Sequence, residues 1–113
     1  MSAVFLEHFQ GAAARVRPDA TAFPHRRTGY DYLVVSQWSN PADTDRCIAW
    51  GRAAFDRMKP YMGAGRYVNY LDRDEPADQV AAAYGANYRR LRRIKKKYDP
   101  SNLFRLNQNI PPA

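Results

Sequence analysis

Residues 30–38 constrain the fold most, because they form a dense run of β-forming side chains with apolar groups on both faces. Period-two alternation divides the run between two faces: Tyr30, Tyr32 and Val34 on one, Leu33 and Val35 on the other. Such a pattern is typical of a strand that is covered on both sides. It predicts a buried central strand, and residues 4–9 predict a second strand ahead of it.

Helix signals follow this strand. Asn40-Pro41 supplies an N-cap and a first helical residue, and apolar residues then recur at spacings of three and four, which predicts a helix over residues 41–58. Pro76 opens a second predicted helix that ends at Tyr84. Residues 17–28 contain two prolines and read as a loop between the strands.

A third helix is predicted over residues 86–97, after a break at Gly85 and before Asp99-Pro100. Its apolar side chains form one stripe at helical spacing: Tyr84, Tyr88, Leu91, Ile94 and Tyr98. The tail over residues 101–113 is expected to be irregular and to pack down through its apolar side chains: Leu103, Phe104, Leu106 and Ile110. Together the patterns predict an α+β fold, a small antiparallel sheet backed by helices with a C-terminal helical segment. The length of 113 residues allows a single domain.

The net charge of +7 is concentrated in this third helix. Residues 89–97 hold seven Lys and Arg, which leaves 18 − 7 = 11 basic against 11 acidic residues elsewhere. A helix with so many cations could follow a phosphate backbone. However, the cations lie on three sides of the helix and no base-reading motif accompanies them. The pattern favours a solvated helix face, with nucleic-acid binding as the alternative.

Several classes of protein are excluded or disfavoured. No apolar run is long enough to span a bilayer and the N-terminus lacks a signal-peptide layout, so we expect a soluble, cytoplasmic protein with no membrane partner. The single cysteine, Cys47, rules out an internal disulfide and a Cys-based zinc site. His8 and His25 are far apart in sequence, so we expect no metal site.

The segment over residues 66–71 is the most unusual local feature. It follows flexible glycines and alternates in residue type like an extended segment, which would place Tyr67 and Asn69 on one side and Val68 and Tyr70 on the other. A phenol beside a carboxamide can act as an acid or base and as a hydrogen-bonding arm toward a planar polar ligand. Core packing is the alternative interpretation of these tyrosines.

Four ordered segments resemble a known family. They are Arg66-Tyr67-Val68-Asn69-Tyr70, residues 83–91 (AYGANYRRL), residues 95–104 (KKKYDPSNLF) and residues 107–112 (NQNIPP). Upstream, residues 20–26 (ATAFPHR) and Trp38 with Asn40-Pro41 add to the series. The series is similar to the C-terminal segment of berberine-bridge-enzyme-like, FAD-linked oxidases of the bacterial type, and it covers the chain from about Gly11.

This resemblance implies roles for parts of the chain. Residues 1–62 would end a substrate domain, and residues 63–113 would be a segment that returns to pack on a flavin domain. Tyr67 matches the family's active-site tyrosine, which takes a hydroxyl proton from a substrate as hydride passes to the flavin. Asn69 matches an asparagine close to the flavin ring.

The resemblance also places three residues of the predicted strand, Tyr30, Tyr32 and Val34, where family members contact substrate, with the helix over residues 41–58 on the back of that sheet. The family's FAD-binding domain has no counterpart in these 113 residues, and no histidine or cysteine here matches a flavin linkage position. We therefore expect weak FAD binding and no activity in isolation, with a separate flavin-binding partner or self-association. The alternatives are a non-enzymatic module that binds nucleic acid or a protein, and a small-molecule domain with a pocket around Tyr30 and Tyr32.

Overall fold

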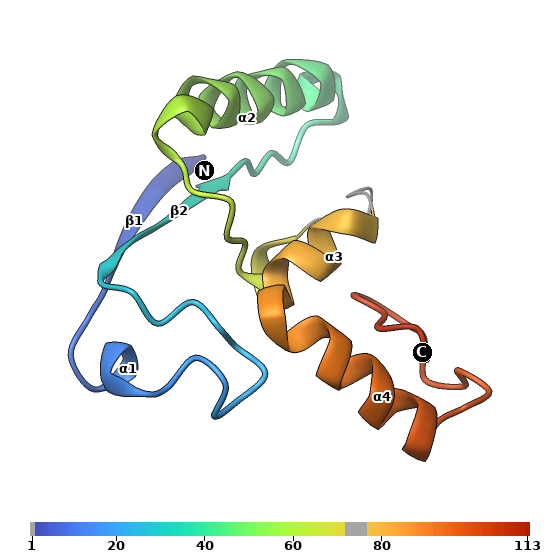
Figure 1. The fold of residues 1–113 in the computed structure, drawn as a ribbon. Helices are drawn as coiled ribbons and strands as arrows, with labels where there is room; N and C mark the ends of the chain where they lie inside the picture. Colours follow the sequence, from blue (N-terminus) through green and yellow to red (C-terminus); the bar gives the residue numbers. More distant parts are fainter. Residues whose placement is uncertain (1, 72–76) are drawn as a thin grey trace. The chain divides into compact units, whose positions relative to one another are not determined.

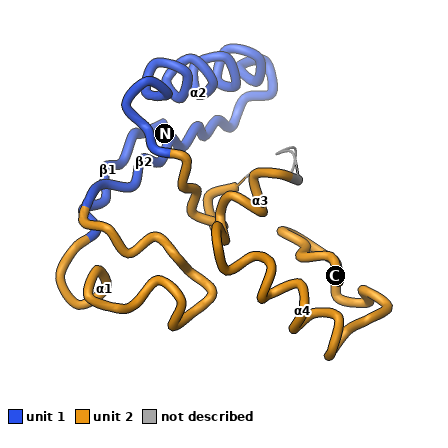
Figure 2. The backbone as a smooth tube through the Cα atoms, viewed as in Figure 1, with its two compact units in different colours: residues 1–9, 29–63 blue, residues 10–28, 64–113 orange. Residues whose placement is uncertain are grey.

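The computed structural model describes residues 2–71 and 77–113, so the predicted helix start at Pro76 lies outside the described residues. The main elements are β1 (Ala3–Phe9), α1 (Ala12–Arg15), β2 (Gly29–Val35), α2 (Thr44–Met58), α3 (Ala77–Tyr84) and α4 (Tyr88–Tyr98) (Figure 1). The α+β prediction is confirmed. The chain divides into two compact units, residues 1–9 with 29–63 and residues 10–28 with 64–113, called unit 1 and unit 2 (Figure 2). The proposed division near residue 62 stays a prediction.

Unit 1 contains the antiparallel pair of β1 and β2, in a register that sets Ala3 opposite Val35 and Phe9 opposite Gly29. Both strands were predicted, but the prediction of a central strand is wrong. Among the described residues the sheet has two strands, so β2 is hydrogen-bonded to a neighbour along one edge. The reason is that apolar residues on both faces indicate that both faces of a strand can be covered. They do not indicate whether a second strand pairs with its other edge.

Helix α2 covers one face of this pair. The Tyr32 hydroxyl donates to the Ala54 carbonyl at 3.2 Å, and the Ser36 hydroxyl donates to the Cys47 carbonyl at 2.9 Å. Because Tyr32 and Ser36 lie four residues apart along an extended chain, their side chains share a face. Helix α2 therefore lies on the face that carries Tyr32, and the expectation that it lies on the opposite side is wrong. The sequence shows that both partners are amphipathic, but it does not say which sheet face meets the helix.

The start and end of α2 follow local signals. The Asn40 side chain accepts a hydrogen bond from the Ala42 N–H at 3.1 Å, which caps a short 3₁₀ helix, η1 (Pro41–Asp43), that leads directly into α2. A second 3₁₀ turn, η2 (Lys59–Tyr61), contains Pro60 and ends the helical run. The predicted helix over residues 41–58 is confirmed, with its first turn in the tighter 3₁₀ form.

The core of unit 2 is small and centred on α3. Val80 and Ala83 are buried, with 7% and 2% of their surfaces exposed. Between α3 and α4 a 3₁₀ turn, η4 (Gly85–Asn87), marks the predicted break. The apolar stripe packs inward only in part, because Ile94 is 42% and Tyr98 74% exposed. The stripe is half-buried where it lies near α3 and is uncovered toward the C-terminal end of α4.

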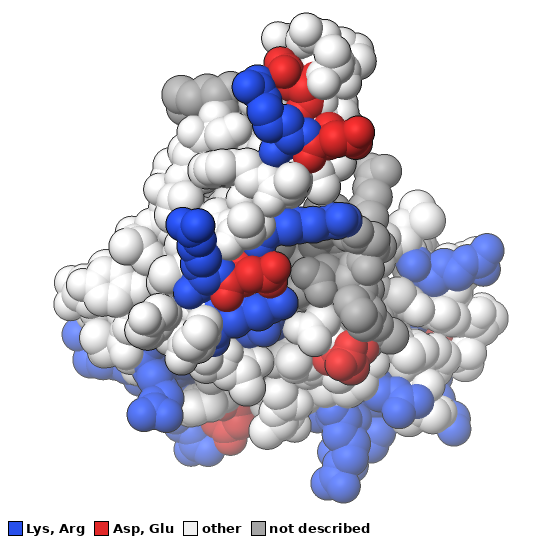
Figure 3. Space-filling model, turned by 90° about the horizontal axis from the view of Figure 1, so that it is seen from above, with Lys and Arg blue, Asp and Glu red and all other residues white. Residues whose placement is uncertain are grey.

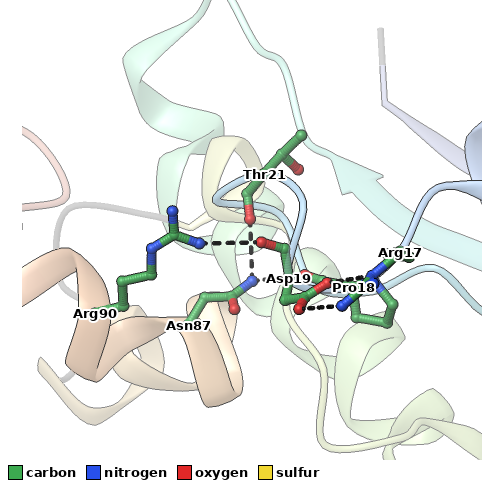
Figure 4. Close-up of polar contacts among 6 residues, drawn as sticks. All are labelled: Arg17, Pro18, Asp19, Thr21, Asn87 and Arg90. Atoms are coloured by element: carbon green, nitrogen blue, oxygen red, sulfur yellow. Dashed lines mark hydrogen bonds and ion pairs between the residues drawn. The ribbon is translucent and has the colours of Figure 1, made fainter.

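The loop over residues 17–28 is held against the start of α4 by Asn87. The buried Asn87 amide donates to the carbonyls of Pro18, at 2.7 Å, and Thr21, at 3.1 Å (Figure 4). Arg90 adds a hydrogen bond to the Asp19 carbonyl at 3.2 Å. A segment without regular structure is therefore fixed by side-chain donors that satisfy its backbone acceptors.

The C-terminal tail folds back beside α4 (Figure 1). The Arg92 guanidinium donates to the carbonyls of Pro111 and Pro112. The expectation that the tail buries its apolar side chains is wrong for three of them: Leu103, Phe104 and Leu106 are 70%, 79% and 87% exposed. The tail is attached through polar contacts to α4, which leave these side chains pointing to solvent.

Candidate functional site

Tyr67 and Asn69 lie on a 3₁₀ turn rather than on an extended segment. Tyr67 has extended backbone angles and precedes η3 (Val68–Tyr70), and the Tyr70 N–H donates to the Tyr67 carbonyl at 2.9 Å. In a 3₁₀ helix, side chains three residues apart share a face. Tyr67 and Tyr70 therefore lie together, with ring centroids 4.8 Å apart and planes at 82°. The prediction that Tyr70 lies opposite Tyr67 is wrong.

The turn brings the predicted pair into direct contact. The Asn69 side-chain amide donates a hydrogen bond to the phenol oxygen of Tyr67 at 2.8 Å. Because the amide is the donor, the Tyr67 hydroxyl keeps its own proton available for an acceptor outside the pair. The Tyr67 ring is half-buried, and Asn69 is exposed. The arrangement can present a phenol oxygen with one preset donor to an external polar group.

A loop from the N-terminal part of unit 2 supports the Tyr67 ring. Phe23 meets Tyr67 edge to face, with ring centroids 5.6 Å apart and an angle of 76° between planes. The Arg26 guanidinium lies over the Phe23 ring, 4.9 Å from its centroid. Tyr67 is thus flanked by Phe23 and Tyr70, which restrict the positions that its ring can take.

His25 connects the same loop to α3 and to the segment before Tyr67. Its Nε2 lies 3.0 Å from the Ala83 carbonyl oxygen, and its ring meets Phe23 edge to face at 5.5 Å. A Cβ placed on Gly65 would lie only 2.8 Å from the Nδ1 of His25, so the chain at Gly65 passes against the imidazole. No local sequence pattern marks Phe23 and His25 individually as supports of Tyr67. Their signal was present in residues 20–26, which carry part of the family resemblance.

The three predicted substrate residues, Tyr30, Tyr32 and Val34, belong to unit 1. Tyr30 is 67% exposed and stacks on His8, its partner across the strands, with ring centroids 4.6 Å apart. Tyr32 binds α2 through its hydroxyl, and Val34 is half-buried. Tyr67 and Asn69 are brought together within unit 2, whereas these three residues are in the other compact unit. Their contact with substrate stays a prediction.

Three cations of the basic helix bind other parts of unit 2. Arg90 and Arg92 donate to backbone carbonyls, and Lys95 forms an ion pair with Asp99 in which the two side chains are 16% and 11% exposed. The expectation that the cations of this helix face water is therefore wrong for Lys95, and Arg92 is half-buried. On the face of the molecule in view in Figure 3, Lys and Arg side chains are interspersed with Asp and Glu.

The ion pair at the end of α4 favours the ionised form of Asp99. The Lys95 ammonium, helped by the backbone N–H groups of Leu103 and Phe104, holds the pKa of Asp99 below its ordinary value of 3.8. Burial raises the pKa of Tyr84, whose ring stacks on Tyr88 in the core of unit 2. Both groups belong to unit 2, which also carries the candidate site.

The described residues contain no group of three His, Cys, Asp or Glu side chains that could hold a metal ion. Cys47 is half-buried on α2. None of the helices in the described part of the chain is long and apolar enough to cross a bilayer. The donor set at the candidate site is instead a phenol and a carboxamide, which suit the edge of a planar ring that carries carbonyl and N–H groups.

Comparison with known proteins identifies a family for the segment that carries these two residues. Residues 66–111, which include Tyr67 and Asn69, match the family described as berberine and berberine like. The uncharacterized FAD-linked oxidoreductase YvdP of Bacillus subtilis is 39% identical over 96% of this chain, and the Arabidopsis thaliana berberine bridge enzyme-like 17 is 32% identical over 93%. The chain covers 24% and 23% of these two relatives.

Solved structures share the fold. The Physcomitrella patens BBE-like 1 structure superposes on 90% of this chain with a TM-score of 0.79 and 35% identity, and 21% of that protein is covered. A glycopeptide hexose oxidase, solved with teicoplanin, superposes on 98% with a TM-score of 0.83 and 28% identity, and 26% of it is covered. Residues 66–111 belong to the berberine and berberine-like family, and the chain as a whole is similar to part of the FAD-linked oxidoreductases. It spans about a quarter of the length of the curated relatives it matches.

Proposed function

We propose that this chain supplies the acid–base half of an FAD-linked oxidase site, with Tyr67 as the proton-accepting group and Asn69 as its hydrogen-bonding partner. The observation that carries the proposal is the 2.8 Å contact from the Asn69 amide to the Tyr67 phenol oxygen, within the region that matches the family. When bound, FAD supplies the two-electron acceptor of such a reaction.

The two side chains have separate tasks in this proposal. Tyr67 first gives its own proton to an acceptor outside the pair and then, as the phenolate, takes the hydroxyl proton of an alcohol substrate, which neutralises the negative charge on its oxygen. Asn69 already donates to this oxygen and stabilises its charged form without reorganisation. The exposed Asn69 amide has a second N–H that can reach the edge of a planar ring. Phe23 and Tyr70 hold the phenol in place.

A separate flavin-binding segment is part of the proposal. Four apolar side chains of unit 2 at the end of α4 and in the tail are 70% to 87% exposed and form what we call the tail patch: Tyr98, Leu103, Phe104 and Leu106. We propose that these side chains together meet another part of a larger protein, because contiguous exposed apolar patches mark interaction surfaces. Because the matched relatives are about four times as long, they contain further chain that could cover the tail patch. The proposed occupant is the flavin-binding part of such a protein.

The binding-module alternative has less support. Nucleic-acid binding would use the cations of α4, but Arg90, Arg92 and Lys95 are already bound to carbonyls or to Asp99. The exposed cations of α4 remain available for salt-dependent attraction. Fluorescence polarisation with RNA and DNA at two salt concentrations tests this alternative, and affinity that vanishes at physiological salt would leave only non-specific attraction.

The proposal is tested with a chimera. The aligned quarter of the YvdP chain is replaced by this chain, and the purified product is examined for bound flavin and for flavin reduction by simple alcohols, hexoses and chitooligosaccharides. The sugars are included because two solved relatives are named a hexose oxidase and a chitooligosaccharide oxidase. The chimera is expected to bind flavin and to be reduced by at least one member of this panel.

The decisive variant is Tyr67→Phe, which keeps the ring and removes the hydroxyl. It should bind flavin normally and slow its reduction by about 100-fold or more, the range for loss of a general base. The matched control is Tyr61→Phe, since Tyr61 is 82% exposed and outside the region that matches the family. Flavin reduction by Tyr67→Phe at the wild-type rate would refute the role of Tyr67. A chimera that binds flavin but is reduced by no panel member would count against an alcohol substrate.

A further inference from the structure

The support of the candidate pair converges on one side chain, His25. His25 lies in the loop over residues 17–28, and its ring contacts the C-terminal half of α3 and the chain at Gly65, just before the site. We propose that His25 is a positioning residue that fixes the turn carrying Tyr67 and Asn69. It does so by bonding α3 on one side and packing against Gly65 on the other.

The bond to α3 sets the position of the ring. Nε2 of His25 lies 3.0 Å from the Ala83 carbonyl oxygen, and since a carbonyl only accepts, this nitrogen carries the proton. Ala83 is 2% exposed, so the bond joins His25 to the most buried part of unit 2. The imidazole therefore has a fixed orientation relative to α3.

The opposite edge of the ring limits the path of the chain toward the site. A Cβ on Gly65 would lie 2.8 Å from Nδ1 and 2.9 Å from Cε1 of His25, closer than atoms of this kind approach. The three atoms nearest to that Cβ all belong to the His25 ring. Gly65 has no left-handed backbone, so the imidazole, and not the chain conformation, is what a side chain at this position would meet.

The same loop also reaches the reacting ring directly. Phe23 meets both the His25 ring, at 5.5 Å, and the Tyr67 ring, at 5.6 Å, edge to face. His25 is thus connected to Tyr67 twice, through the backbone at Gly65 and through the Phe23 ring. A change at His25 should move the Tyr67 and Asn69 side chains before it affects distant parts of the unit.

Nuclear magnetic resonance of the full chain tests the proposal without flavin or substrate. The readouts are the ring signals of Tyr67, the Phe23–Tyr67 contacts and the side-chain amide signal of Asn69. Backbone amide signals of α4 report whether unit 2 stays folded. His25→Ala should abolish the Phe23–Tyr67 contacts and shift the Asn69 signal, whereas His25→Gln, which keeps an N–H donor for the Ala83 carbonyl, should retain both. His8→Ala in unit 1 is the control and should change neither.

A second pair of variants tests the contact at Gly65. Gly65→Ala should disturb the Tyr67 and Asn69 signals, and the double variant with His25→Ala should show no further loss, because the imidazole that the new Cβ meets is gone. Gly63→Ala is the control, since a Cβ there meets no atom of the described residues within 4 Å. Unchanged site signals in His25→Ala, or equal loss in His25→Gln and His25→Ala, would overturn the proposal. Loss of the α4 signals in both His25→Ala and Gly65→Ala would also overturn it, by showing a general stabilising role.

The inference rests on the proposed function only in naming Tyr67 and Asn69 as the reacting groups. Its test measures side-chain geometry in the free chain, whereas the proposed function is tested by flavin reduction in the chimera. If the chimera shows no flavin reduction but the Tyr67 and Asn69 signals change in His25→Ala, the proposed function is rejected and the positioning role is kept. If the chimera is active but these signals do not change in His25→Ala, the positioning role is rejected and the proposed function is kept.

Discussion

The Asn69 side-chain amide donates to the phenol oxygen of Tyr67 across 2.8 Å, although the two residues are only two positions apart in the chain. An extended segment would place these side chains on the same side, but a strand rise of about 3.3 Å per residue would separate them. The 3₁₀ turn η3 shortens this path and closes the contact. The pair is therefore a product of the turn.

Removal of the amide donor should slow the proposed reaction more than it affects binding. Asn69→Ala leaves the Tyr67 oxygen without its preset donor, and a lost donor of this kind typically costs about 100-fold in rate. In the chimera, flavin reduction should therefore slow by about this factor while bound flavin stays near the wild-type level. The control is Asn40→Ala, which removes the cap of η1 in unit 1. Equal rates in Asn69→Ala and wild type would rule out a role for the amide in the reaction.

Replacement of Asn87, which binds the loop over residues 17–28, should lower the stability of the fold. Asn87→Ala leaves the carbonyls of Pro18 and Thr21 without their donor, which should lower the free energy of unfolding by about 1 to 3 kcal/mol. Urea unfolding followed by circular dichroism measures this loss in the helices. Arg89→Ala, an exposed change on the same stretch of chain, should stay within about 0.5 kcal/mol of wild type. Similar losses in both variants would contradict the structural role of Asn87.

The interaction of Asp99 with Lys95 should make part of the free energy of unfolding sensitive to acid. Its folded-state pKa lies below 3.8, so the unfolded chain takes up a proton more readily. The stabilisation is therefore complete above pH 3.8 and is lost as the pH falls through the folded-state pKa. Asp99→Asn should be less stable than wild type at pH 7 and should lose less stability on acidification. Urea midpoints measured from pH 7 down to values below 3.8 check both expectations.

Asp19→Asn is the matched control for Asp99. The Arg17 guanidinium lowers the pKa of Asp19 in the same direction, but the two side chains of this pair are 81% and 60% exposed. An exposed ion pair contributes little, so this substitution should change the acid dependence less than Asp99→Asn does. A larger effect at Asp19 would show that the contact at the end of α4 is not the main acid-sensitive interaction of the two.

A side chain at Gly85, at the junction of α3 and α4, should lower stability through the backbone conformation. Its φ of +47° lies in the left-handed region, and a Cβ there would reach ordinary contact with Pro24. Gly85→Ala should therefore cost about 1 kcal/mol through conformational strain, without a serious clash. Thermal unfolding measured by circular dichroism should show a lower midpoint than in Gly63→Ala, where the new Cβ has no neighbour within 4 Å in the part of the chain that the structure describes. Equal midpoints would show that the junction tolerates a side chain.

The sequence determined the elements that depend on local signals. Asn40-Pro41 fixed the start of the first long helix, Gly85 the break after α3, and Asp99-Pro100 the end of α4. Caps, prolines and helical spacing act within a few residues, so they can be recognised in a single chain. The residue types at positions 67 and 69 likewise indicated where a phenol and a carboxamide would occur together.

The tertiary structure decided how these elements meet. The turn at Tyr67 is flanked by Phe23 and His25 from a loop far upstream, and α2 covers the face of β2 that carries Tyr32. The tail attaches through Arg92 and leaves its apolar side chains exposed. These outcomes depend on contacts between residues that are distant in the chain, and neither periodicity nor capping encodes which distant partner a side chain will reach.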